Sequence, residues 1–243
     1  MKTSNSSLNA LPHITYKRSG RARHLNIRIK QYKGVEVSVP NGMSMSTAEQ
    51  FVLQKRKWII RNLLKVKQLE ADSVIYDGTQ RIRTRWHRLT VRSGRSTGIT
   101  CRISKGTILV GYPAYMKVTA PDVQFAIRKG LIAAYRKEAK EYLPGRLAEL
   151  AQNYGFQYNK VFVKNHRSRW GSCSEKNNIN LSLHLMRLSD HLIDYVILHE
   201  LVHTEIKNHS PVFWKRLAEV CPEAQSLRRK LRLKTKELKP LYG

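Results

Sequence analysis

The chain has 243 residues, which is enough for one large domain or two modest domains with hydrophobic cores. Its 45 lysine and arginine residues outnumber its 17 acidic residues, and the formal net charge of +28 indicates anionic partners or substrates. Three widely spaced cysteines argue against a zinc ribbon or a disulfide framework, and no segment approaches the ~20 apolar residues of a membrane span, so we expect a cytoplasmic protein.

The first part of the chain has the pattern of a small sheet followed by a helix. Residues 1–12 are polar and lack the apolar run of a signal peptide, so we expect a loose tail. Three segments then alternate apolar and polar side chains, which is typical of half-buried antiparallel strands. They are residues 13–18, 25–30 and 34–39. Ser46 or Thr47 caps a predicted helix over 48–69.

Between residues 77 and 113 the pattern predicts further strands. Several arginines alternate there with uncharged residues, which predicts a sheet with one strongly cationic face. They are Arg81, Arg83, Arg85, Arg88 and Arg92. A solvated face and an anion-binding face both fit this pattern.

The remaining part of the chain is predicted to be mainly helical. Pro121 begins a long helix, and we expect Pro144 to break or kink it, because proline lacks the N–H group and clashes with the preceding turn. A second helical piece over 146–154 ends at Gly155. The other predicted elements are strands over 161–163 and 179–183 and helices that begin near residues 190, 211 and 222. The sequence shows no internal repeat and no long linker.

The most informative stretch of the chain reads His-Glu-Leu-Val-His over residues 199–203 and lies on a predicted buried helix. Residues four apart share one helix face, so His199 and His203 can together bind a zinc ion, and Glu200 can reach a water bound to that ion. His209 follows just past the predicted helix end and can supply the third ligand. The fourth position is then left for water, which is typical of a catalytic zinc site.

The spacing of these residues argues against incidental histidines. Chance gives His-Glu-x-x-His in roughly one such chain in sixty, and a further histidine at this spacing lowers the chance below about one in a thousand. The third ligand has alternatives, because Glu219 or Glu223 could take the place of His209. The helix stop at Lys207 and Asn208 favours His209, since the chain must turn back there to reach the metal.

Four segments resemble the YgjP-like metallopeptidase family, which is also described as predicted metal-dependent hydrolases related to the WLM and SprT-like zinc proteases. The segments are 165–173, 178–181, 193–203 and 208–214. The resemblance implies one zinc ion per chain on His199, His203 and His209, with Glu200 as the catalytic base. The metzincins share the histidine spacing, but they have glycine where Ile206 stands here and a methionine turn downstream.

Taken together, the patterns and the resemblance predict an α+β fold in three parts. Residues 1–12 form the tail, and residues 13–117 form a β-rich region with a small antiparallel sheet and a helix. Residues 118–243 form a zincin-like metallopeptidase half that contains a short sheet and the metal-binding helix. We expect the β-rich region to pack on this half, because no linker-like stretch divides them.

The segment just ahead of the metal-binding helix supplies the candidate substrate-binding residues. In related proteases a strand at this place lies beside the substrate. Arg167 and Arg169 could clamp a carboxylate or a phosphate, although two solvated arginines on a structural turn are equally consistent with the sequence. We expect Trp170 to lie in the core and Gly171 to permit the close approach of another backbone.

The leading functional prediction is a zinc-dependent metallopeptidase acting on a peptide or protein. A nucleotide phosphohydrolase of the nucleoside triphosphate pyrophosphatase kind is the first alternative, because a cationic cleft concentrates polyphosphates, although no phosphate-binding glycine loop is present. A nucleic-acid-associated protease or a nucleic-acid-binding protein is the second alternative, because the predicted cationic strands and the last helix form a basic surface.

Overall fold

The computed structural model describes residues 14–30, 34–71, 75–166 and 168–238. Across these residues it contains six α-helices and three small sheets, so the predicted α+β class is confirmed. The chain divides between residues 74 and 75 into two compact units. The predicted tail, residues 1–12, and His13 lie outside the described residues. None of the described helices combines the length and the apolar character that a membrane span requires.

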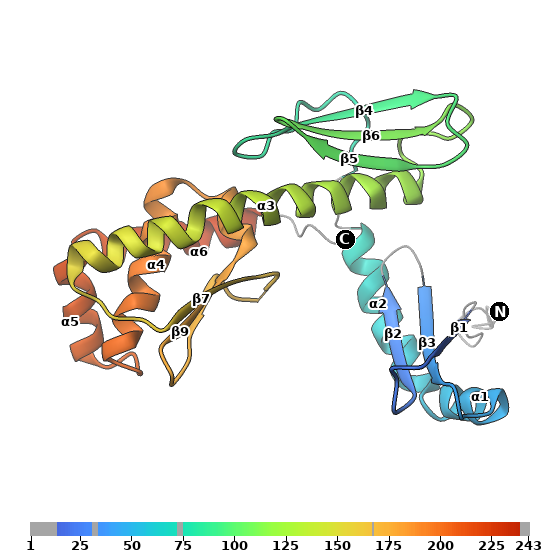
Figure 1. The fold of residues 1–243 in the computed structure, drawn as a ribbon, viewed down its shortest axis with the longest axis horizontal. Coiled ribbons are helices and arrows are strands. Elements are labelled where there is room, and N and C mark those ends of the chain that lie inside the picture. The colour runs from blue at the N-terminus through green and yellow to red at the C-terminus, as the bar shows by residue number, and fades with distance from the viewer. Residues whose placement is uncertain (1–13, 31–33, 72–74, 167, 239–243) are drawn as a thin grey trace, which may run out of the picture. The chain divides into compact units, whose positions relative to one another are not determined.

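The first unit is a three-stranded sheet with two helices (Figure 1). Its elements are β1 (Ile14–Ser19), β2 (Asn26–Lys30), β3 (Gly34–Pro40), α1 (Met45–Gln54) and α2 (Arg56–Ala71). Every second residue of β3 is a fully buried valine, as the alternating pattern predicts. These valines, Val35, Val37 and Val39, form one core with Ala48 and Val52 of α1 and Ile59 of α2.

Three details of this unit correct the sequence prediction. The sheet is mixed, because β1 runs parallel to β3 while β2 runs antiparallel to it. The predicted helix over 48–69 is two helices separated at Lys55, and its N-cap is Ser44, whose Oγ accepts a hydrogen bond from the Thr47 N–H at 3.1 Å. Side-chain periodicity continues across the break at Lys55 and does not encode strand direction. The sequence pattern therefore revealed neither the helix break nor the parallel pairing of β1.

The second unit begins with a sheet that packs on the first half of a long helix (Figure 1). Its elements are β4 (Arg88–Gly94), β5 (Thr100–Ser104), β6 (Thr107–Pro113) and α3 (Pro121–Tyr154). Gly130 allows the close contact: a Cβ added there would lie 2.8 Å from Cys101 Sγ and 2.9 Å from Ile108 Cγ2. The helix therefore approaches the sheet more closely than a larger residue would permit.

Two expectations about this region need correction. The predicted break at Pro144 is absent, because α3 continues through this residue and buried side chains on both sides of it, including Leu143 and Leu147, stabilise the helix by packing. The alternating arginines Arg81, Arg83 and Arg85 predict a strand, but the structure has only one bridge there, between Arg83 and Arg88. A buried carboxylate holds this segment against α3 instead, because Glu138 accepts a hydrogen bond from the Trp86 N–H at 3.0 Å.

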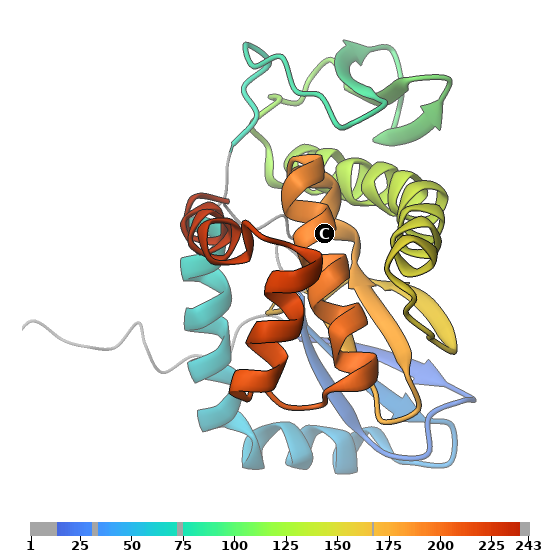
Figure 2. The same cartoon turned by 90° about the vertical axis from the view of Figure 1, so that its left-hand side faces the viewer.

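The third sheet and the last helices complete the second unit (Figure 2). Its elements are β7 (Lys160–Lys164), β8 (Gly171–Cys173), β9 (Asn178–Ser182), the 3-10 helix η2 (Leu183–Arg187), α4 (Asp190–Glu205), α5 (Pro211–Val220) and α6 (Ala224–Glu237). The helix α4 contacts α3, α5, α6 and β8, and it is apolar on nearly all sides. An α-helix with this pattern is expected in the centre of a core.

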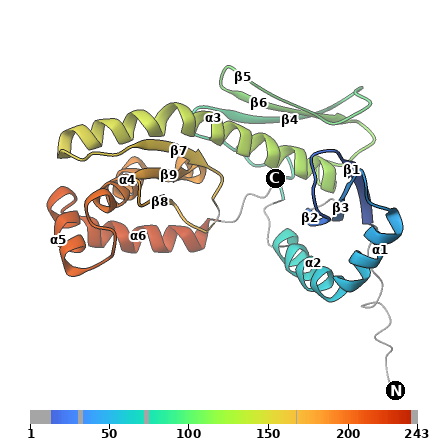
Figure 3. The ribbon, with the colours of Figure 1, turned by 60° about the horizontal axis from the view of Figure 1, so that its bottom comes forward.

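The three sheets share one strand order, although the sequence shows no repeat. In each sheet the last strand lies in the centre, parallel to the first and antiparallel to the second (Figure 3). Each central strand begins at or directly after a residue with positive φ. These are Gly34 at 72°, Gly106 at 73° and Asn177 at 53°. The repeated feature is the path of the backbone, because glycine and asparagine readily adopt the positive φ found at each of these three positions. The side chains differ between the three sheets.

Candidate metal centre

Two successive turns of α4 and the chain directly after it bring three imidazoles together. His199 and His203 lie one turn apart near the end of α4, on the same face. The helix ends at Ile206, whose N–H donates to the Val202 carbonyl, and His209 directly precedes Ser210, the N-cap of α5. The short connection between the two helices therefore positions His209 opposite the other two histidines.

The three imidazoles converge on one point. The Nε2 atom of His209 lies 3.2 Å from Nε2 of His203 and 3.1 Å from Nε2 of His199. Tetrahedral zinc with Zn–N bonds of ~2.0–2.1 Å requires its nitrogen ligands to lie about 3.3 Å apart. The observed spacing fits a single cation of this kind, and no other group of three His, Cys, Asp or Glu side chains in the described residues converges in this way.

The ring orientations suit metal binding. Nδ1 of His203 lies 2.9 Å from the Ile206 carbonyl and donates to it when it carries the proton, which leaves Nε2 as the free lone pair. The Phe213 ring packs against all three imidazoles, with ring centroids 4.5 to 4.9 Å apart. Nδ1 of His199 is buried and has no hydrogen-bond partner among the described residues. Hydrophobic packing is therefore the main support of the His199 ring.

The surroundings favour the neutral form of two of the imidazoles, those of His199 and His203. Burial lowers the pKa of His199 to about 3, and the neighbouring His203, His209 and Arg228 add to this effect. Burial also lowers the pKa of His203. A neutral imidazole is the form that binds metal, so protons would compete weakly with a cation for His199 and His203 near neutral pH.

Glu200 faces the third sheet from α4. Its side chain is buried, and burial raises its pKa to about 8, while the positive charge of Arg169 acts in the opposite direction. The carboxylate fills the space beside Gly171 of β8, where an added Cβ would lie 2.5 Å from Glu200 Oε1. Only glycine at this position of β8 leaves room for the carboxylate as it stands.

The candidate substrate-binding residues have different surroundings. Arg167 lies outside the described residues. Arg169 is exposed, and its charge reaches Glu200. Trp170 is half-buried rather than in the core, because its indole N–H donates to Thr235 Oγ1 of α6 at 3.0 Å. Gly171 makes room for a carboxylate rather than for a second backbone.

Sequence reasoning missed a basic residue near the centre. The guanidinium carbon of Arg228 lies 4.5 Å from the centroid of the Trp214 ring, which in turn stacks on His209. No signal distinguished this arginine, because α6 is basic along its whole length. The alternative third ligands are absent from the histidine cluster. Glu219 instead pairs with Arg216 at 3.4 Å, and Glu223 stands at the N-cap position of α6 without a side-chain capping hydrogen bond.

The match to a family model agrees with a metal site. A family model described as YgjP-like, metallopeptidase domain, matches residues 23–234. No curated protein matches the chain. Solved structures similar to part of the chain include two metallopeptidase zymogens, jannalysin of Methanocaldococcus jannaschii and abylysin of Pyrococcus abyssi. Their sequence identities are 22% and 24%, both TM-scores are 0.34, and the matches cover 37% of this chain and 94% and 92% of theirs.

Proposed function

The chain belongs to the YgjP-like metallopeptidase family, a family of metal-dependent hydrolases, and we propose that it is a zinc peptidase with Glu200 as its general base. The observation that carries the proposal is the convergence of the three imidazoles. The buried carboxylate of Glu200 follows His199 directly in α4. This combination supplies three ligands and one proton acceptor, which is the set that metal-assisted hydrolysis needs.

Each residue has a defined role in this proposal. His199, His203 and His209 hold the cation through their Nε2 atoms. When bound, zinc supplies Lewis acidity that polarises the substrate carbonyl and makes water more acidic. The positive charge of a bound cation would favour the ionised form of Glu200, which accepts a proton from the attacking water on a carboxylate oxygen and returns it to the departing amine nitrogen. A water molecule and a peptide bond are thereby converted into a carboxylate and an amine.

The third sheet offers a place for the substrate backbone. The strand β8 lies at the edge of its sheet, pairs with β9 on one side and packs against α4. A free strand edge can bind an extended peptide through main-chain hydrogen bonds. In this proposal the peptide pairs with β8, which brings a scissile bond next to Glu200. Arg169 then lies beside the bound peptide.

One experiment tests both the metal and the base. Purified protein that has been loaded with one equivalent of zinc is incubated with casein, and new amino termini are measured. We expect cleavage by the native chain and loss of cleavage in Glu200→Gln, with zinc retained at one ion per chain by elemental analysis. His199→Ala should lose the zinc itself. Cleavage by Glu200→Gln would contradict the assignment of the base.

The net charge of +28 favours an anionic substrate as a second candidate. The same preparations are therefore also offered nucleoside triphosphates and single-stranded DNA. Release of pyrophosphate or phosphate that depends on Glu200 would support a nucleotide phosphohydrolase. Binding of DNA that falls steeply with salt would support a nucleic-acid-associated protein.

A further inference from the structure

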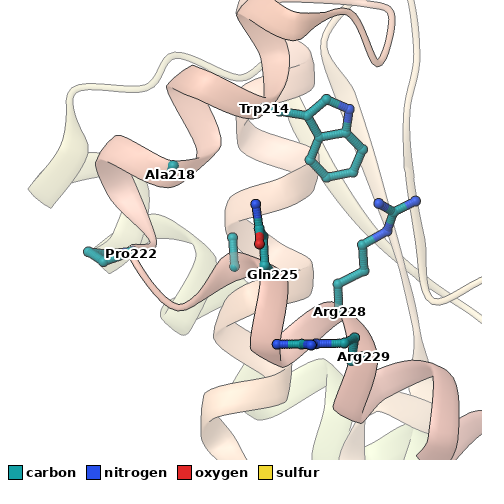
Figure 4. Close-up of a pocket in the computed structure, with 7 residues that line it drawn as sticks. Trp214, Ala218, Pro222, Gln225, Arg228 and Arg229 are labelled. Atoms are coloured by element: carbon teal, nitrogen blue, oxygen red, sulfur yellow. The ribbon is translucent and has the colours of Figure 1, made fainter.

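A cavity of about 500 Å³ lies between α5 and α6, next to the metal centre. Figure 4 shows the side chains of Gln225 and Arg228 extending from α6 toward Trp214, which comes from α5. Most of the remaining wall is apolar and is formed by Ala218, Pro222 and Ala224. Arg229 completes the lining on the α6 side. The cavity therefore combines an apolar wall with a basic one.

Trp214 is shared by the cavity and the metal centre. Its indole stacks on the His209 imidazole, with ring centroids 5.6 Å apart and an interplanar angle of 26°, and its Nε1–H donates to the His209 carbonyl at 3.1 Å. The Arg228 guanidinium carbon lies 4.5 Å from the same indole. One residue of an extended peptide spans about 3.5 Å, so a substrate at the metal reaches the cavity within a few residues.

No carboxylate among the described residues neutralises the two arginines of the cavity. In the part of the chain that the structure describes, neither Arg228 nor Arg229 forms an ion pair with a carboxylate. Arg216 of α5, by contrast, pairs with Glu205 at 3.0 Å and with Glu219 at 3.4 Å. The N-terminal end of the 14-residue helix α6, which also lines the cavity, adds the positive end of its dipole.

We propose that this cavity is a specificity site that binds a carboxylate of the peptide substrate through Arg228, supported by Arg229 and the amide of Gln225. The planar fork of a guanidinium matches a carboxylate, and the apolar wall accommodates the methylene groups that carry it. The proposal rests on the peptidase function proposed above. The carboxylate can come from an aspartate or glutamate side chain or from the C-terminus of the peptide.

The test measures binding separately from cleavage. The zinc-loaded Glu200→Gln protein is titrated into four pools of fluorescein-labelled octapeptides, and fluorescence anisotropy is recorded at about 0.15 M salt, where the Debye length is about 8 Å. The pools contain either one glutamate or one glutamine at scanned positions, and each ends in a free acid or an amide. We expect the pools that carry the recognised carboxylate to bind about tenfold more tightly than their neutral counterparts.

Matched variants separate the cavity from the general positive charge. Arg228→Gln should remove most of the tenfold preference. Lys230→Gln removes the same charge from an exposed position of α6 outside the cavity lining and should leave the preference unchanged. Thermal unfolding checks that both variants are folded. If a variant does not fold, the comparison of the four pools on the protein with a native α6 still tests the carboxylate preference.

Each outcome has a defined meaning. A preference for glutamate with either terminus assigns the site to an acidic side chain, and a preference for the free acid with either residue assigns it to the C-terminal carboxylate. Equal binding of all four pools overturns the proposal, as does an equal loss in Arg228→Gln and Lys230→Gln. If the native protein cleaves no peptide while the carboxylate preference is present, the peptidase function fails and the binding site stands.

Discussion

The sheet of β4–β6 and the sheet of β7–β9 have the same strand order, and each packs against a helix through a glycine. In the first sheet the glycine is Gly130 of the helix, and its neighbours are the side chains of Cys101 and Ile108. In the second sheet the glycine is Gly171 of the strand, and its neighbour is the carboxylate of Glu200. The same architecture therefore serves apolar packing in one copy and holds a buried acid in the other.

The difference between the two contacts shows that a buried polar group needs extra space beside it, which the neighbouring Gly171 provides. The contact of α3 with its sheet can be built from apolar atoms alone, which stabilise the fold by burial. The contact of α4 with β8 contains an acid whose pKa burial raises to about 8. We infer that the second contact sacrifices stability for a proton acceptor beside the histidines, and the following experiments test this inference.

The largest expected effect comes from removing the acid. Glu200→Gln keeps the size of the side chain and its place beside Gly171 but removes the proton acceptor. We expect kcat to fall by about 10²- to 10⁴-fold, which is the usual contribution of general acid–base catalysis, while zinc content stays at one per chain. Steady-state kinetics on a cleaved peptide and elemental analysis check this. A variant that lost zinc as well would show that Glu200 also supports the metal site.

The two glycines should respond differently to the same substitution. Gly171→Ala forces the Glu200 carboxylate to move, so we expect kcat to fall by about tenfold or more with zinc retained. Gly130→Ala overpacks the contact with β5 and β6, so we expect unfolding to become easier by about 1–3 kcal/mol with kcat unchanged. Kinetics and chemical denaturation on both variants check the pair. Similar kinetic losses in both would end the distinction between the two contacts.

The pH dependence of stability should reveal the buried acid in the metal-free protein. The pKa of Glu200 in the folded chain, about 8, exceeds its ordinary value of 4.5, so its contribution to stability is complete below pH 4.5 and is lost as the pH rises through 8. We expect the native chain to lose stability between pH 6 and pH 9 relative to Glu200→Gln, by an amount on the order of a few kcal/mol. Thermal unfolding of both proteins with a chelator present measures the difference.

The lowered pKa of His199 should make the metal-free protein less stable as the pH falls, whereas the raised pKa of Glu200 makes it less stable as the pH rises. Its pKa in the folded chain, about 3, lies below its ordinary value of 6.5, so its contribution is complete above pH 6.5 and is lost as the pH falls toward 3. Metal-free protein in which His199 is replaced by the similarly sized Gln should lose less stability between pH 6.5 and pH 4 than the native chain. An identical acid response in both proteins would contradict the buried, neutral state of this ring.

The smallest expected effect concerns the contact between the β8 region and α6. Trp170→Phe removes the indole N–H that donates to Thr235 Oγ1 at 3.0 Å, and a partly exposed hydrogen bond of this kind contributes about 0.5–1 kcal/mol. We expect stability to fall by that amount and kcat to change less than twofold. Urea denaturation and kinetics check this, and a large kinetic loss would mean that Trp170 positions the substrate.

The sequence was informative where chemistry depends on local spacing. The histidines at 199 and 203 share a face because they lie four residues apart on a helix. The stop expected at Lys207 and Asn208 lies just past the observed helix end at Ile206, after which the chain leads to His209. The direction of β1, the break at Lys55 and the persistence of α3 through Pro144 depend on contacts between distant segments. Periodicity within one segment carries no information about such contacts.

The unbroken course of α3 has a consequence for dissecting the protein. This single helix contacts β5 and β6 near its start and β7 and α4 farther along, so both sheets of the second unit pack against it (Figure 3). A fragment that begins at residue 75 keeps β5, β6, β7 and α4, all of which contact α3. A truncation at residue 120 instead removes β5 and β6 and exposes buried side chains of α3, including Ile127 and Leu131. Fragments intended to carry the metal centre should therefore begin at residue 75.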